Sequence, residues 1–320
     1  MKLVGIYYLS VISDCSVNSD SRLYELDVEG SLTEYFLPKN PNPSWALRYS
    51  DKPWILEPLT LRENKIMTYK PSTPFINASL TEHCLSVEFN RPDALNALRP
   101  EMLAEAARLV RQASDDTDVK VIVLRGAGRA FSAGVDLKVL QGIKPEGGII
   151  GNVFDEPAAE LASAIRDSGV PVIARAVGAC FTGALEVALH CDFVYTTDST
   201  KFGDTHTKFG LRPTWGMSQT LSRAVGQRRA RELSFTARIF TGAQAVEWGV
   251  ANASFDSPEA LDEALAATCA QIAGNSAEAV AAMKDLYRLA ECEQGIRESL
   301  AGETASNYEI SDTDERLSAF

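Results

Sequence analysis

The chain has 320 residues, with 31 Lys or Arg against 43 Asp or Glu, and its formal net charge is −12 at pH 7. This acidic balance argues against a nucleic-acid-binding protein, because such binding depends on a basic face that releases counterions from the phosphates. It leaves room for a phosphorylated ligand, since a local cluster of basic side chains can hold phosphates on an acidic protein.

The six cysteines show no C-x-x-C spacing, and the chain has only three histidines. We therefore expect reduced cysteines, no metal site and a cytoplasmic protein. No apolar run approaches the ~20 residues that a membrane-spanning helix needs. Association with a membrane is not expected.

The first 80 residues carry no recognisable chemistry. Residues 1–12 superficially resemble a signal peptide, but they lack a small-x-small cleavage site, and the acidic residues that follow argue against a mitochondrial presequence. Residues 13–80 are rich in Pro, Ser, Asn and Asp. We expect residues 1–80 to be an extension that is loosely packed or partly disordered.

Strands and helices alternate in the next part of the chain. Alternating apolar residues predict a strand that stops at Arg91-Pro92, and Pro100 opens a helix with apolar residues at helical spacing. Two further apolar runs are each followed by a glycine-bearing turn. The predicted elements are strands at residues 84–90, 119–126, 170–177 and 193–195 and helices at residues 100–114 and from about Gly183.

The turn between the strand at residues 170–177 and the next helix brings two unusual groups together. Gly183 has a bare backbone N–H close to a helix N-terminus, which is a ready anion site. Glu186 is a lone carboxylate on the otherwise apolar first turn of that helix. A desolvated acid costs several kcal/mol unless it is paired or has a task. The pattern alone leaves open whether Glu186 is catalytic or points to solvent.

Five motifs in order resemble the crotonase superfamily, the enoyl-CoA hydratase/isomerase group that acts on acyl-CoA thioesters. The resemblance covers roughly residues 82–315. The motifs are Phe89-Asn-Arg-Pro-Asp-Ala-Leu-Asn-Ala-Leu98, the Gly128 to Lys138 turn, the Gly178 to Asp192 segment, Phe202-Gly through Pro213-x-x-Gly216, and Leu221 to Gly226 with Phe240 to Val250.

The resemblance implies an α/β fold, a crotonase-type spiral of repeated ββα units, over residues 81–256. It also implies a C-terminal helical region at residues 257–320 that covers the pocket and builds a homotrimer or a dimer of trimers. Helical stretches at residues 258–273 and 276–301, split by Gly274-Asn275, are consistent with that region. A Rossmann fold is the alternative, but no G-x-G-x-x-G follows a strand.

The resemblance also assigns the groups that carry the chemistry. A thioester enolate needs two N–H donors aimed at its oxygen, and these fall at Val135 and Gly183. Glu186 matches one of the two glutamates that hold water in the family's hydratases. The second position is His206, with Asp204 two residues before it. A histidine can transfer protons near neutral pH, but His206 could instead only hydrogen-bond within its loop.

Further residues are expected to contact the substrate. The resemblance suggests Ala133, Asp136, Lys138 and Trp215 for the substrate or its CoA part, with Phe209 beside Trp215 in the acyl pocket and Lys284 as a cation that a neighbouring subunit brings to CoA phosphates. Surface charge and core packing explain these residues equally well. No cofactor beyond CoA is implied.

The function that we expect is that of an enoyl-CoA hydratase, which adds water to a 2-enoyl-CoA or removes it from the hydroxy product. An enoyl-CoA isomerase is the alternative, since that reaction needs a single proton-shuttling acid and Glu186 would suffice. A third possibility is a crotonase-fold scaffold without activity, in which the missing second glutamate marks lost catalysis.

Overall fold

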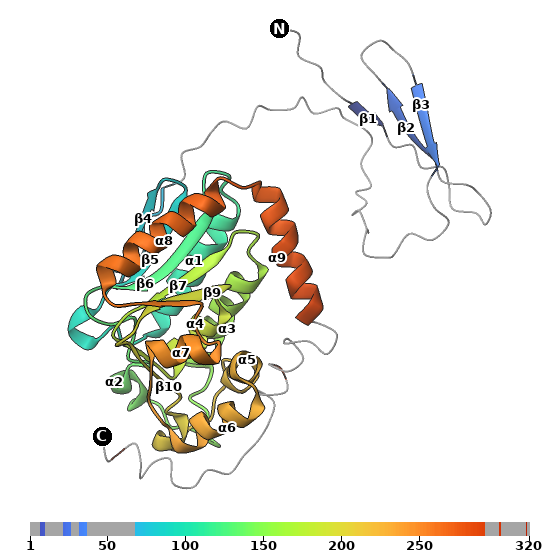
Figure 1. Cartoon of the computed structure of the whole chain (residues 1–320). Coiled ribbons are helices and arrows are strands. Elements are labelled where there is room, and N and C mark those ends of the chain that lie inside the picture. Colours follow the sequence, from blue (N-terminus) through green and yellow to red (C-terminus); the bar gives the residue numbers. More distant parts are fainter. Residues whose placement is uncertain are drawn as a thin grey trace, which may run out of the picture. The chain divides into compact units, whose positions relative to one another are not determined.

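The computed structural model describes residues 68–291, three strands before them and the single residues 301 and 318. Two compact units divide between Lys65 and Ile66. In the first unit, β1 (Tyr7–Leu9), β2 (Arg22–Leu26) and β3 (Leu32–Phe36) pair as an antiparallel sheet in the order β1-β2-β3 (Figure 1). All the site residues predicted above belong to the second unit.

The second unit is built on a six-stranded sheet in the order β12-β9-β7-β6-β5-β4. Every neighbouring pair is parallel except β4 and β5, which are antiparallel. The centre is β7, whose residues are all buried, as the apolar run predicts for a parallel strand covered on both faces. The strands are β4 (Ile76–Thr81), β5 (Cys84–Phe89), β6 (Val121–Gly126), β7 (Val172–Ala176), β9 (Phe193–Thr197) and β12 (Ala253–Phe255).

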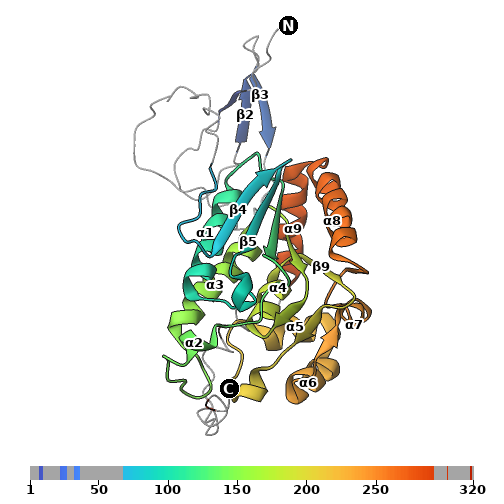
Figure 2. The same cartoon turned by 90° about the vertical axis from the view of Figure 1, so that its left-hand side faces the viewer.

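Helices cover both faces of this sheet. On one side α1 (Pro100–Ser114) packs against α3 (Asn152–Asp167), and the apolar stripe of α1 is buried as its spacing predicts. On the other side α8 (Pro258–Ala273) buries Leu261 and Leu265 against Val121 and Val123 of β6. In Figure 2 the sheet therefore lies between α1 and α3 on the left and α8 on the right.

A second, smaller sheet has three strands and contributes to a ββα unit. Its order is β11-β10-β8, with β8 parallel to β10. Since β8 follows β7 and leads directly into α4 (Gly183–His190), the three form a ββα unit. The remaining elements are β8 (Ala179–Phe181), β10 (Lys201–Gly203), β11 (Phe240–Thr241), η2 (Pro92–Ala94), α2 (Leu137–Leu140), η3 (His206–Phe209), α5 (Met217–Val225), α6 (Gln227–Thr236), α7 (Gly242–Trp248) and α9 (Ala277–Glu291).

Two glycine-bearing turns are fastened together at the end of the sheet. The N–H of Phe131 donates to Val177 O at 2.7 Å, and the N–H of Ser132 donates to Ala179 O at 3.0 Å. Gly178 has φ +72°, and a Cβ there would run into the carbonyl oxygen of Arg129. Glycine is thus required for this approach, which brings the turn before α2 against the turn before α4.

The second unit begins earlier than the expected boundary at residue 80. β4 pairs along its whole length with β5, and the segment before β4 lies on α1. Tyr69 donates its hydroxyl to Asp116 at 2.6 Å, and the N–H of Ser72 donates to Glu105 at 3.0 Å. Burial raises the pKa of Glu105, but hydrogen bonds from Arg108 and Ser72 outweigh burial and lower it to about 2. Residues 68–80 are therefore part of the core.

Two deletion variants test which N-terminal residues belong to the extension and which belong to the core. Deletion of residues 1–65 is expected to change the free energy of unfolding by less than about 0.5 kcal/mol. Deletion of residues 1–81 removes β4 and the Ser72 donors of a buried carboxylate, and we expect it to cost at least ~2 kcal/mol. Urea unfolding measures both. Equal stability of the two variants would contradict the assignment of β4 to the core.

Candidate functional site

Most of the predicted site residues line one cavity of about 90 Å³. The cavity lies where the turn before α2, the start of α4, η3 and the segment before α5 meet. Its walls include Ala133, Val135, Gly183, Glu186, His206, Phe209 and Trp215. Residues from four separate parts of the chain thus surround one small space.

Two backbone N–H groups at this cavity are available to a ligand. The peptides around Val135 are paired with Leu98: the N–H of Leu98 donates to Gly134 O at 2.7 Å, and Leu98 O accepts from Asp136 at 2.9 Å. The N–H of Val135 itself, and that of Gly183 at the first position of α4, have no hydrogen-bond partner within residues 68–291. Both can therefore donate to an oxygen in the cavity.

The backbone before Gly183 is held in an unusual conformation. Thr182 has φ +50°, which is rare for a β-branched residue. Its N–H donates to Gly203 O at 2.9 Å, and its hydroxyl accepts from the N–H of Thr205 at 3.3 Å. The small sheet thus maintains a strained turn at the candidate site, where such strain commonly serves function.

The carboxylate of Glu186 is buried and anchored. The residue is 1% exposed, which excludes the solvent-facing alternative. Its Oε1 accepts from the N–H of Trp215 at 3.2 Å and from the N–H of Met217 at 3.0 Å. Two backbone donors stabilise the ionised form of a desolvated acid, so Glu186 is held in place while its other oxygen remains at the cavity.

His206 lies between two acids. Its Nδ1 is 2.7 Å from Asp204 Oδ1, and its Nε2 is 3.7 Å from Glu186 Oε2. Burial raises the pKa of Asp204, but the hydrogen bond and charge of His206 outweigh burial and lower it. An ionised Asp204 accepts a hydrogen bond from Nδ1–H of His206. Nε2 then faces Glu186 Oε2 at a distance too long for a direct hydrogen bond. The pair can hold a small polar molecule between them.

Trp215 connects Glu186 to two residues that the sequence analysis did not identify. Its indole Nε1 donates to Asp155 at 2.9 Å, and its carbonyl oxygen accepts from His190 at 2.7 Å. Burial raises the pKa of Asp155, although the donors on Thr214 and Trp215 oppose the rise. His190 could have been noticed as a lone polar residue in an apolar run, whereas nothing local marks Asp155.

The structure places three predicted contact residues elsewhere. Asp136 caps α2 and pairs with Arg91 at 2.8 Å, and Lys138 is exposed on α2 outside the cavity wall. The ammonium of Lys284 donates to Asp192 at 2.7 Å and to two carbonyl oxygens of its own chain. Burial raises the pKa of Asp136, but Arg91 and the backbone of α2 lower it.

Neither a metal site nor a membrane span is present in the described part of the chain. Over residues 68–291 no group of three His, Cys, Asp or Glu side chains is arranged to hold a metal ion. None of the helices described there is both long enough and apolar enough to cross a bilayer. The walls of the cavity include the backbone of Val135 and Gly183, the carboxylate of Glu186 and the imidazole of His206.

Comparisons with known proteins find similar sequences and similar folds. A sequence model of the family described as enoyl-CoA hydratase/isomerase matches residues 80–319. A probable enoyl-CoA hydratase of Mycobacterium bovis is 32% identical over 237 residues, 73% of this chain and 90% of the relative. A peroxisomal Delta(3,5)-Delta(2,4)-dienoyl-CoA isomerase of Arabidopsis thaliana is 31% identical, over 65% of this chain and 79% of the relative. The solved enoyl-CoA hydratase/isomerase of Pseudoalteromonas atlantica has a TM-score of 0.66 and 27% identity, over 77% of this chain and 96% of that chain.

A methyl group at Gly183 should disturb the site without unfolding the protein. A Cβ there would lie 2.5 Å from Cζ3 of Trp215, so Gly183→Ala must displace the indole or the turn. We expect turnover of an acyl-CoA substrate to fall at least ~10²-fold, the usual effect of a lost oxyanion donor. Gly274→Ala, where a Cβ meets nothing closer than 3.4 Å, is the control. Full activity of Gly183→Ala would exclude Gly183 from the site.

Proposed function

The chain belongs to the enoyl-CoA hydratase/isomerase family, and we propose that it is an enoyl-CoA hydratase. The substrate is a 2-enoyl-CoA thioester, and the product is the 3-hydroxyacyl-CoA. One observation carries the proposal: His206 faces Glu186 across 3.7 Å in the cavity that also holds two N–H groups without protein partners. These are the groups that addition of water to a conjugated thioester requires.

The two backbone donors stabilise the enolate that forms in the first part of the reaction. When the oxygen of water bonds to C3 of the enoyl group, the electron pair of the double bond moves onto the thioester oxygen and forms an enolate. The N–H groups of Val135 and Gly183 donate to that oxygen, and each such donor is worth ~10² to 10³ in rate. Protonation at C2 then restores the thioester.

Two side chains move the protons. Glu186 and His206 hold the water between Oε2 and Nε2, and together they remove one proton from it and deliver one proton to C2. Asp204 orients the imidazole through Nδ1. His206 with Asp204 thus takes the place of a second glutamate.

The isomerase remains the second candidate because one acid suffices for it and a relative of 31% identity is named an isomerase. Glu186 is held by two backbone donors and could act alone as the acid and base of an isomerisation. The inactive scaffold is disfavoured, since a protein without activity has no need for a buried carboxylate, a strained Thr182 and two unpaired N–H groups at one cavity.

The remaining assignments follow the family. Ala133 and Trp215 border the acyl group, Asp136 keeps the oxyanion turn in shape through Arg91, and Lys138 at the surface meets CoA phosphates. Coenzyme A enters as part of the substrate, and no other cofactor is required. The protein is a cytoplasmic homotrimer or dimer of trimers. Size-exclusion chromatography with light scattering tests that assembly.

Glu186→Gln tests the proposed reaction. We expect kcat for hydration to fall at least ~10²-fold, while KM changes little because CoA contacts lie elsewhere. Steady-state assays against a panel of enoyl-CoA and hydroxyacyl-CoA thioesters measure this. Glu88→Gln, in a half-buried pair with Arg125 that does not line the cavity, is the control. Isomerisation without hydration in the wild-type protein would select the alternative function.

His206→Gln tests the second proton carrier. If His206 carries one of the protons, kcat/KM contains a limb that reports the titration of its imidazole, and we expect this limb to vanish in His206→Gln. Asp204→Asn should shift that limb to lower pH, because it removes a negative charge that stabilises the imidazolium. An unchanged pH profile in both variants would make His206 structural.

A further inference from the structure

Two cysteines that are 185 positions apart in the sequence meet between the large sheet and α8. The sulfur atoms of Cys84 and Cys269 are 3.6 Å apart, and both thiols are free. Cys84 is the first residue of β5, and Cys269 lies in the last turns of α8. Figure 1 shows α8 lying across the sheet. Spacing along the sequence does not reveal this pair, because two distant elements bring it together.

Both sulfur atoms are carried by well-packed elements. A two-residue turn joins β4 to β5, and its residues Glu82 and His83 have φ angles of +47° and +67°. Such a turn fixes the register of a hairpin, and Cys84 pairs directly with Thr81 across it. Cys269 belongs to the buried stripe of α8 that packs against β6. The contact between the two sulfur atoms is therefore set by the packing of a helix on a sheet.

The two thiols differ in accessibility. Cys84 is half-buried, whereas Cys269 is 7% exposed. Both residues line a cavity of about 550 Å³ that is bordered by the exposed turn at Glu82 and His83. This volume is in the range of pockets that admit small organic molecules. A reagent that enters the cavity therefore reaches the sulfur of Cys84 more readily than that of Cys269.

The contact also makes the two thiols chemically unequal. A hydrogen bond from the thiol of Cys269 lowers the pKa of Cys84, although burial opposes this change. The same hydrogen bond raises the pKa of Cys269, and burial and the charge of Cys84 add to the rise. The thiolate is the attacking form in thiol–disulfide exchange. Cys84 is thus the nucleophile of the pair, and Cys269 is a protonated thiol beside it.

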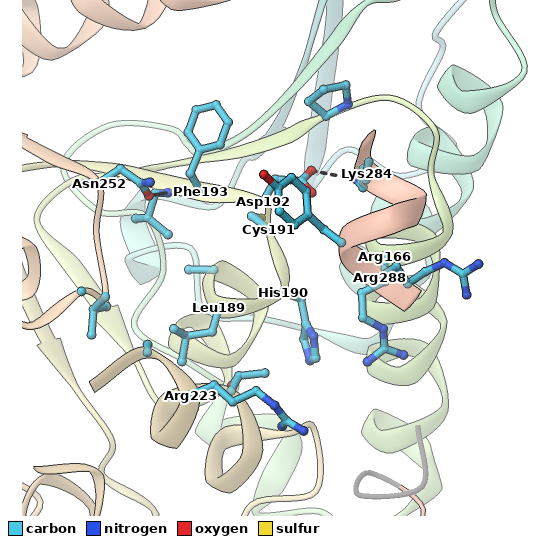
Figure 3. Close-up of a pocket in the computed structure, with 18 of the residues that line it drawn as sticks. Arg166, Leu189, His190, Cys191, Asp192, Phe193, Arg223, Asn252, Lys284 and Arg288 are labelled. Carbon is cyan, nitrogen blue, oxygen red and sulfur yellow. Dashed lines mark hydrogen bonds and ion pairs between the residues drawn. The ribbon is translucent and has the colours of Figure 1, made fainter. Parts of the chain in front are cut away.

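Two other cysteines in the described part of the chain lie in different surroundings. Cys180 is fully buried, and burial raises the pKa of its thiol. Cys191 follows α4, as Figure 3 shows, and its thiol donates to Val187 O at 3.5 Å. Burial raises the pKa of Cys191 as well. Cys180 and Cys191 are therefore internal references that should resist a reagent that attacks Cys84.

We propose that Cys84 and Cys269 are a dithiol modification site whose substrate is a low-molecular-weight disulfide. The thiolate of Cys84 attacks one sulfur of the reagent, which forms a mixed disulfide and releases the other half as a thiolate. Cys269 gives its proton to that thiolate and attacks the sulfur of Cys84, which releases the second half. The two protein thiols lose two electrons and two protons, and the reagent gains them as two thiols.

The new bond joins β5 to α8 at a distance from the candidate active site. Its formation brings the two sulfur atoms from 3.6 Å to about 2 Å. Neither cysteine lines the cavity around Glu186, so the dithiol is independent of the proposed function. A crosslink restricts the unfolded chain most when it closes a long loop, and this one spans 185 positions. Oxidation therefore stabilises the fold.

Oxidation of the full chain by glutathione buffers tests the site. The protein is equilibrated at graded ratios of oxidised to reduced glutathione, alkylated and mapped by mass spectrometry of its peptides. We expect the peptides of Cys84 and Cys269 to become linked while Cys180 and Cys191 stay reduced. Tm should rise by at least about 5 °C in the linked protein, and dithiothreitol should reverse both changes.

Three variants separate the two steps of the reaction. Cys269→Ser removes the second thiol, so glutathione should remain attached to Cys84. Cys84→Ser removes the nucleophile, and Cys269 should then react at least about tenfold more slowly than Cys84 does in the wild type. Cys15→Ser, in the first unit, is the control and should behave as the wild type does. If a variant does not fold, the peptide map of the wild type still decides.

Three results would overturn the proposal. One is glutathione that stays on Cys84 of the wild type without a linked peptide. Another is a reduced pair at ratios that already oxidise Cys15 or Cys292. The third is a linked peptide that joins Cys84 or Cys269 to any other cysteine. A linked pair with an unchanged Tm would retain the site and refute the stabilisation.

Discussion

The pair of hydrogen bonds that holds Glu186 is the constraint on which the site depends. Burial of an unpaired carboxylate would cost several kcal/mol, and the N–H groups of Trp215 and Met217 remove most of that cost. These donors come from the segment that follows β10 and η3. The position of the carboxylate therefore depends on how this segment packs against α4.

Under the proposed function, the second proton carrier is a histidine in place of a glutamate. His206 occupies the place where the family's hydratases carry another glutamate, and Asp204 orients it from two residues away. An imidazole with an ionised partner can accept or donate a proton near neutral pH. The spacing to Glu186 Oε2 suits one water molecule between the two side chains. The substitution therefore retains two groups that can exchange protons.

Trp215 has three polar attachments, two to α4 and one to α3. Glu186 accepts from its N–H, His190 donates to its carbonyl oxygen, and Asp155 of α3 accepts from its indole. His190 and Glu186 of α4 are thus both hydrogen-bonded to the backbone of one residue. Buried polar groups that are fully satisfied favour a single arrangement of such a segment.

The sequence by itself determined the elements whose signals are local. The helices α1 and α8 begin and end where Pro100, Pro258 and the apolar spacing predict, and the Gly183-to-Glu186 spacing places a carboxylate one turn after an open N–H. Only the tertiary structure decided that β4 belongs to the core, that Asp155 and His190 reach Trp215, and that Glu186 faces His206. The contacts of Trp215 with Asp155 and His190 and of Glu186 with His206 join residues 20 to 60 positions apart. Which residues meet in these contacts depends on how successive turns of the chain stack. No periodic pattern in the sequence predicts that stacking.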